Sequence, residues 1–239
     1  MKQENNYHIF DPEKTLEENF SSQSTPLLLM EQLRMLDYPI SRGISYERTV
    51  DEFLLQLETN DSLRPLRNCP EAVILLNEEG AMIRQEGRWE LLFTPERPEG
   101  QTLTEKMNLP ALLKRLLADE KKKNVCRVRI PERSLKVLVS GNAPFSILDE
   151  YCKAQPGRYL SVAEKIVYEG MEVLSQNVPV CRYGKLISAD KEEIENYHTI
   201  KALLDDYIYQ YDHLDNSENL QPLSIAVFGA PGCGKSFGV

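Results

Sequence analysis

Apolar residues recur at three- and four-residue steps in several stretches of this chain, and such spacing predicts amphipathic helices. We expect helices from Ser45 to Leu57, from Asn108 to about residue 120, and over residues 145–151, 161–174 and 190–211. Ser45 and Asn108 are suited to N-cap positions, because their side-chain oxygens can accept a backbone N–H of the first turn.

The helix over residues 190–211 has the strongest pattern. Asp190 followed by Glu193 resembles a capping box, with aspartate in place of the usual Ser or Thr. Its apolar stripe consists of Ile194, Tyr197, Lys201, Leu204, Ile208 and Tyr211, in which only Lys201 is out of character. His198 lies beside this stripe, and we expect it to face solvent.

Short apolar runs bounded by proline, glycine or asparagine predict strands. Such runs cover residues 72–76, 89–93, 125–130 and 135–139, with Pro131 between the last two. Gly80 marks a turn, so that residues 89–93 are expected to return beside 72–76. Residues 27–36 form another buried element, which ends at Pro39. Helices and strands together predict an α/β fold.

Composition divides the chain into segments. Residues 1–25 are polar and rich in turn-forming side chains, and we expect a flexible arm. An α/β domain over 26–124 and a mixed α/β region over 125–215 follow, the latter ending in the long helix. Residues 216–222 are polar, end at Pro222 and predict a linker, after which residues 223–239 begin a separate domain.

The net charge and the cysteine content bear on the binding partners and the cellular compartment of the protein. A formal net charge of −9 argues against broad binding of nucleic acids or anionic membranes, since both favour a basic face. The cysteines are scattered without a C-x-x-C pair (Cys69, Cys126, Cys152, Cys181 and Cys233) and are typical of reduced thiols. The polar start resembles no signal peptide, and no apolar run approaches the roughly 20 residues of a transmembrane helix. We therefore expect a cytoplasmic protein without a membrane partner.

The strongest chemical signal lies close to the end of the sequence. The pattern G-x-x-x-x-G-K-S/T is met by Gly229, Ala230, Pro231, Gly232, Cys233, Gly234, Lys235 and Ser236. The apolar run 223–228 precedes it and predicts the strand from which such a loop starts. Glycines at the bends let successive backbone N–H groups approach a phosphate without obstruction by side chains.

Each part of this loop has a predicted role in binding a nucleotide. The backbone from Gly229 to Lys235 cradles the phosphates, and Lys235 is the catalytic candidate, which neutralises charge on the β and γ oxygens. The hydroxyl of Ser236 is the predicted metal ligand, for Mg²⁺. Cys233 occupies a variable position of the loop.

Residues 223–236 resemble the opening strand and Walker A loop of the P-loop NTPases, and the loop is close to the form found in AAA-type ATPases. The resemblance implies binding of ATP or GTP with Mg²⁺ and, usually, hydrolysis. It covers residues 223–239 only, and the family's Walker B acid, sensor residues and arginine finger have no counterpart here. We therefore expect an N-terminal fragment of a larger ATPase, which is active as an enzyme only in the full-length protein.

In this interpretation, the residues before the linker form an accessory region that recognises a protein partner or a signal. The helix over 190–211 would couple that region to the ATPase. Residues 40–93 also resemble, more weakly, part of a ribokinase-like sugar kinase, through a helix, a strand and Glu79-Gly80-Ala81-Met82. That family's catalytic Asp-Thr-x-Gly-Ala-Gly-Asp loop is absent.

Two alternatives stay open. The chain can be a non-catalytic interaction module with a vestigial phosphate loop, or a degenerate sugar-kinase-like domain that senses a nucleoside or sugar. The choice between ATP and GTP, the partner and the oligomeric state are likewise open.

Overall fold

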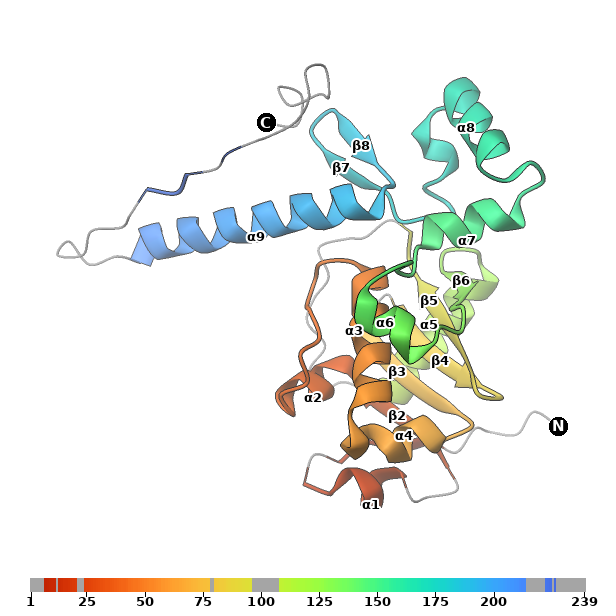
Figure 1. Cartoon of the computed structure of the whole chain (residues 1–239), viewed down its shortest axis with the longest axis vertical. Coiled ribbons are helices and arrows are strands. Elements are labelled where there is room, and N and C mark those ends of the chain that lie inside the picture. The colour runs from red at the N-terminus through yellow and green to blue at the C-terminus, as the bar shows by residue number, and fades with distance from the viewer. Residues whose placement is uncertain are drawn as a thin grey trace.

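Six strands form one mixed sheet at the centre of the described part of the chain (Figure 1). The computed structural model describes residues 7–11, 13–20, 24–77, 80–95, 108–213, 222–224 and 226. The strands are β1 (Tyr7–Ile9), β2 (Thr25–Leu29), β3 (Ala72–Asn77), β4 (Gly80–Gln85), β5 (Arg88–Phe93) and β6 (Cys126–Arg129). The first three run parallel, and β3 to β6 pair antiparallel, each with the next strand along the chain.

Helices cover both faces of this sheet, with α3 and α4 on one face and α5 on the other. The helices of the described residues are α1 (Leu16–Phe20), α2 (Met30–Met35), α3 (Tyr46–Thr59), α4 (Arg64–Asn68), α5 (Leu109–Lys121), α6 (Leu135–Ser140), α7 (Ile147–Ala154), α8 (Arg158–Glu169) and α9 (Lys191–His213). Of these, α8 and α9 lie beyond one end of the sheet (Figure 1). Short 3₁₀ turns cover Asp61–Leu63 and Met171–Val173, and β7 (Cys181–Tyr183) pairs with β8 (Leu186–Ser188) in a separate hairpin. This arrangement confirms the α/β class.

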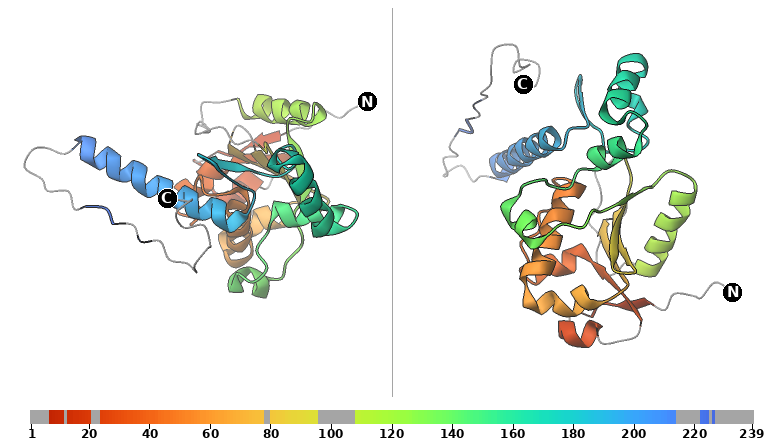
Figure 2. Two further views of the ribbon diagram at one scale, coloured as in Figure 1. Left: turned by 90° about the horizontal axis from the view of Figure 1, so that it is seen from above. Right: turned by 45° about the vertical axis from the view of Figure 1, so that its right-hand side comes forward.

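The sheet separates two apolar cores because successive side chains of a strand point to opposite faces. Leu28 and Ile74 join the core beneath α3 and α4, whereas Leu27 and Val73 join the core beneath α5. The two helical layers are visible on either side of the strands in Figure 2.

The two predicted N-caps are confirmed. The Ser45 hydroxyl accepts the N–H of Arg48 at 2.9 Å, and the Asn108 side chain accepts the N–H of Ala111 at 3.1 Å. Each bond satisfies one of the backbone donors that the first turn of a helix leaves without a partner. The predicted core face of α3 is buried, from Val50 to Leu57.

The strand predicted over residues 135–139 is wrong, because this segment forms α6. The carbonyl of Ser134 accepts the N–H groups of Val137 and Leu138, which closes a helical turn. The segment packs against α3, and Leu138 touches the core there, so tertiary contact overrides the β propensity of its valines.

Two pairing expectations also differ from the structure. Residues 89–93 do form a strand, but β4 lies between it and β3, so that β5 pairs with β4. Residues 27–30 are buried as predicted, but Met35 and Leu36 are exposed, and the segment divides into β2 and α2 at Met30.

Part of the expected arm over 1–25 is ordered. β1 pairs with β2, and the rings of Phe10 and Phe20 are both buried, with centroids 6.1 Å apart. Asn19, also buried, exchanges hydrogen bonds with the backbone of Asp11. These contacts join residues within one short segment, and this polar segment shows no periodicity from which they could be predicted.

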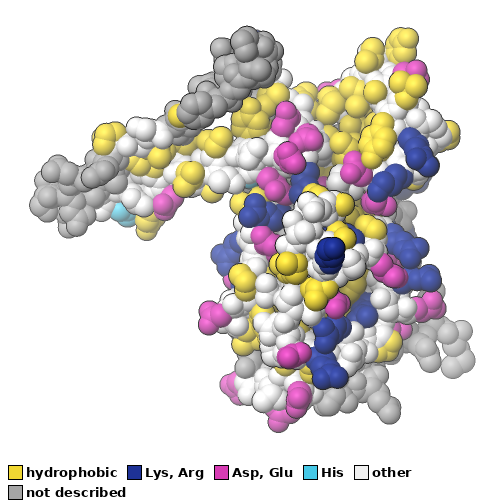
Figure 3. Space-filling view, in the orientation of Figure 1, with side chains coloured by type: hydrophobic (Ala, Val, Ile, Leu, Met, Phe, Trp, Pro, Cys, Tyr) yellow, Lys and Arg dark blue, Asp and Glu magenta, His cyan; other side chains and the backbone are white. Residues whose placement is uncertain are grey.

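The long predicted helix is present as α9, and its far end projects from the molecule (Figure 1). Ile194 is 6% exposed, but along the same stripe the exposed fractions rise to 54% at Ile208 and 67% at Tyr211. Apolar side chains are visible on this helix in Figure 3. Among the described residues, no helix combines the length and apolarity needed to cross a bilayer.

Candidate functional site

The predicted phosphate loop lies outside the described residues. The structure therefore does not place Gly229, Ala230, Pro231, Gly232, Cys233, Gly234, Lys235 or Ser236, and their roles stay predictions. Of the segment leading into the loop, it describes residues 222–224 and 226, which are in no helix or strand.

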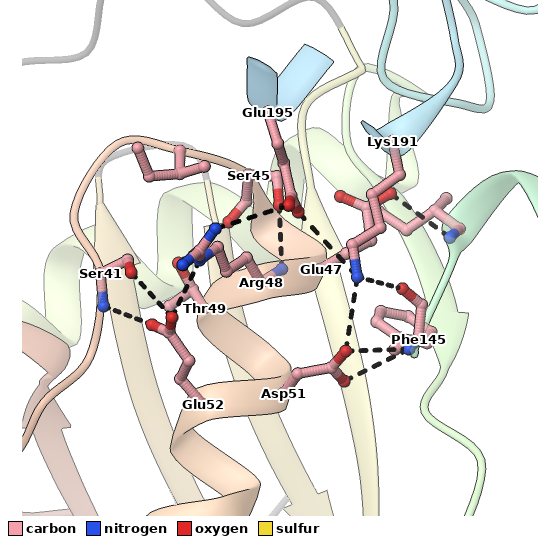
Figure 4. A network of polar contacts seen from close by, with 12 residues as sticks. Ser41, Ser45, Glu47, Arg48, Thr49, Asp51, Glu52, Phe145, Lys191 and Glu195 are labelled. Atoms are coloured by element: carbon pink, nitrogen blue, oxygen red, sulfur yellow. Dashed lines mark hydrogen bonds and ion pairs between the residues drawn. The ribbon is translucent and has the colours of Figure 1, made fainter. Parts of the chain in front are cut away.

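A cluster of polar side chains lies where α9 meets α3 (Figure 4). We call it the α3–α9 cluster: Ser41, Ser45, Glu47, Arg48, Asp51, Glu52, Arg133, Phe145, Lys191 and Glu195. Four of these residues lie in the first half of α3, which Ser45 caps, whereas Lys191 and Glu195 lie one turn apart at the start of α9. These polar residues lie outside the apolar stripes from which the two helices are predicted, and the sequence gives no sign that they meet.

Asp51 is the centre of one half of this cluster. Its carboxylate accepts the N–H of Phe145 at 3.0 Å and forms ion pairs with Arg133 at 2.6 Å and Lys191 at 3.4 Å. Lys191 also donates to the carbonyl of Phe145 at 3.3 Å. One carboxylate of α3 thus holds both the start of α9 and the segment that leads into α7.

Glu195 is the centre of the other half. It accepts a hydrogen bond of 2.6 Å from the Ser45 hydroxyl, and it lies 3.8 Å from Arg48 and 3.9 Å from Lys191. Ser45 therefore both caps α3 and binds α9. Glu52 continues the cluster, since it accepts from Arg48 at 2.9 Å and from the Ser41 hydroxyl at 2.8 Å.

Glu47 is the buried acid of the cluster, with only 6% of its surface exposed. Burial raises the pKa of its carboxyl group, because water no longer solvates the charge. The N–H of Ile147, at 3.4 Å, and the nearby Lys191 lower this pKa in part. Protonation of Glu47 would leave the other three carboxylates of the cluster balanced by Arg48, Arg133 and Lys191.

A small cavity adjoins the cluster. Its walls include Glu47 and Lys191, together with Pro179 and Cys181 from the segment around β7 and His198 from α9. Its volume of about 20 Å³ is close to the space that a single water molecule occupies. The cavity therefore admits water or a molecule of similar size, and a nucleotide does not fit into it.

His198 is half-buried, contrary to the expectation that it faces solvent. Its Nδ1 lies within hydrogen-bond distance of the Ile44 carbonyl, and its Nε2 lies 3.7 Å from the sulfur of Cys181. The ring of Tyr183 stacks on Tyr197 at 4.7 Å and meets the imidazole edge-on at 6.1 Å. The hairpin β7–β8 thus shields this face of α9 from solvent.

The predicted capping box of α9 is present in modified form. Asp190 accepts the N–H of Glu193 at 3.0 Å, as predicted. Instead of reaching the Asp190 N–H itself, Glu193 accepts from the Ser188 hydroxyl at 2.6 Å, and Ser188 accepts the Asp190 N–H at 3.1 Å. The N-terminus of α9 is therefore fixed to β8 as well as to α3.

Within the described part of the chain, no group of three or more His, Cys, Asp or Glu side chains is placed to hold a metal ion. Comparison with known proteins adds no relative: no family model matches the chain, and neither curated proteins nor solved structures give a match.

Proposed function

We propose that this chain is part of a P-loop nucleotide-binding protein of AAA-like type, in which residues 229–236 bind ATP or GTP together with Mg²⁺. The observation that carries the proposal is the agreement of this stretch with every fixed position of the phosphate-loop pattern, directly after an apolar run. In the full-length protein, hydrolysis of the nucleotide is the expected activity.

The chemistry follows from the residue types. Backbone N–H groups from Gly229 to Lys235 surround the phosphates, and Lys235 stabilises negative charge that develops on the γ-phosphate during transfer to water. Ser236 supplies one oxygen ligand to Mg²⁺.

The described residues support a coupling role for α9 in this protein. The α3–α9 cluster fixes the start of the helix to the sheet region, while Leu204 and Ile208 near its other end are exposed. Nine residue steps separate positions 213 and 222, so the following segment begins within about 32 Å of that end. We propose that the nucleotide-binding part packs on this exposed stripe, and that the sheet region receives the signal of a protein partner.

Nucleotide binding by protein expressed from the complete coding frame tests this proposal. ATP or GTP with Mg²⁺, at about 100 times its Kd, stabilises a binding protein by about 2.7 kcal/mol, which a thermal shift detects. Lys235→Ala should abolish the shift. Lys165→Ala, at an exposed position of α8, is the matched control and should retain it.

The other outcomes are equally informative. Absence of a nucleotide-dependent shift in the wild type would contradict the proposal and favour an interaction module. A shift with ribose-type ligands that survives Lys235→Ala would favour the sugar-sensing alternative.

A further inference from the structure

Cys181 and His198 form a thiol–imidazole pair at the wall of the small cavity. The tautomer of the imidazole follows from its second contact, because the Ile44 carbonyl can only accept a hydrogen bond. Nδ1 must therefore carry the proton, and in the neutral ring Nε2 is left as an acceptor. It is this nitrogen that lies 3.7 Å from the Cys181 sulfur, in position to take the proton of the thiol.

The other described cysteines have different surroundings. Burial raises the pKa of the thiols of Cys69, Cys126 and Cys152. Cys69 donates to the Pro65 carbonyl and Cys126 to the Gln176 carbonyl, at 3.3 and 3.1 Å. Because a carbonyl cannot take the proton away, these contacts favour the neutral thiol, which is a poor nucleophile.

We propose that Cys181 is a site of oxidation by hydrogen peroxide, with His198 as its base. Hydrogen peroxide is close to water in size and fits the cavity of about 20 Å³ that Cys181 and His198 line. Cys181 is half-buried and forms part of the wall of this cavity.

The reaction balances with these groups alone. His198 Nε2 takes the thiol proton, and the resulting thiolate attacks one oxygen of the peroxide. An S–O bond forms, the O–O bond breaks, and the sulfur loses two electrons to the peroxide. The departing hydroxide receives the proton held by the imidazolium, so that the products are cysteine sulfenic acid, water and neutral histidine.

The position of the pair gives the modification a structural effect. Cys181 lies at the start of β7 and His198 on α9, so the added oxygen enters the contact between these two elements. Oxidation would therefore act on the anchored end of α9. A small thiol such as dithiothreitol reverses it, because sulfenic acids condense with thiols and are then reduced.

Sulfenic-acid trapping in the full chain tests the proposal. The reduced protein is exposed to hydrogen peroxide with dimedone present, and the label at each cysteine is followed by peptide mass spectrometry. We expect Cys181 to be labelled about tenfold faster than Cys69, Cys126 or Cys152, because only Cys181 among these four has a base, His198 Nε2, beside its thiol. Equal rates among the four would overturn the proposal.

The variant His198→Asn tests the role of His198 as the base. In His198→Asn, the asparagine amide reaches the Nδ1 position and keeps a donor for the Ile44 carbonyl, but no base remains at Nε2. Labelling of Cys181 should fall to the rate of the other cysteines, while that of buried Cys152 stays unchanged and shows that the fold is intact. An unchanged Cys181 rate in a folded variant would overturn the role of His198. If Cys152 labelling rises, the variant has lost its fold, and the comparison within the wild type decides.

Discussion

The sheet region (residues 7–140) and the C-terminal region (residues 145–213) are held in different ways. The sheet region has an apolar core on each face of its strands, with Phe53 and Leu113 among the buried side chains. The C-terminal region has one small core of its own around Cys152 and Val162. Its Phe145 and Ile147 join the core of the sheet region, whereas the start of α9 contacts α3 through charged and polar groups. Apolar burial stabilises without regard to direction, whereas the polar cluster fixes the placement of one helix.

A core substitution should have the largest effect. Phe53 is fully buried and meets Trp89 edge-on, with ring centroids 5.4 Å apart. Phe53→Ala should lower the free energy of unfolding by about 3–5 kcal/mol, through lost burial and the cavity left behind. Urea unfolding followed by circular dichroism measures this.

The matched control for Phe53 is an exposed aromatic residue. Tyr168 on α8 is 86% exposed, and Tyr168→Ala should cost less than about 0.5 kcal/mol. A loss as large at Tyr168 as at Phe53 would contradict the assignment of the core to the sheet region.

Loss of the central carboxylate of the α3–α9 cluster should have an intermediate effect. Asp51→Asn leaves Arg133 and Lys191 without the negative charge that they share, both with side chains less than 15% exposed. We expect a loss of about 2 kcal/mol. Hydrogen exchange should rise mainly in α9 and α7, and less in the strands.

Asp205→Asn is the control for the charge change. Its ion pair with Lys201 on the same helix is exposed, and such pairs contribute under about 1 kcal/mol. If hydrogen exchange in Asp51→Asn rose as much in the strands as in α9 and α7, the cluster would support the whole fold rather than the placement of α9.

The smallest effect is expected at Glu47 and depends on pH. Because burial raises its pKa above the ordinary 4.5, the folded state keeps this proton over a pH range in which the unfolded state has lost it. The contribution of Glu47 is therefore complete below pH 4.5 and decreases as the pH rises through the folded-state pKa. Glu47→Gln stays neutral and can still accept the Ile147 N–H, so that its stability relative to the wild type should increase with pH.

Urea titrations between pH 4 and pH 8 measure this difference. Exposed Glu164→Gln on α8 controls for the substitution itself. If the difference in free energy of unfolding between the wild type and Glu47→Gln stayed constant over this pH range, the Glu47 carboxyl would titrate normally.

Local features of the fold could be predicted, because their causes lie within a few residues. Ser45 and Asn108 cap the helices that follow them, and each contact spans three residues. The same local reasoning failed for residues 135–139, where packing against α3 decides the conformation, and it missed β4, which contains Arg84 and Gln85 and has no clear alternation.

The candidate site could not be predicted from sequence for the same reason. Lys191 and Asp51 are 140 residues apart, and His198 and Ile44 are 154 residues apart. A histidine on a helix next to tyrosine gives no sign that a distant carbonyl fixes its tautomer. The phosphate loop is the opposite case, because its pattern lies within eight consecutive residues and can be recognised from the sequence alone. The roles of its residues stay predictions.

The strand order of the sheet has a consequence for folding kinetics. Every strand from β1 to β6 pairs with its neighbour in the sequence, so each pairing closes a shorter loop than one between distant strands would. Loop closure costs more entropy as the loop grows, and contacts of large sequence separation form more slowly. The chain can thus complete its sheet by successive additions, whereas the docking of α9 on α3 must close a loop of some 140 residues. We expect that docking to be a late event, after the surface that receives the helix has formed.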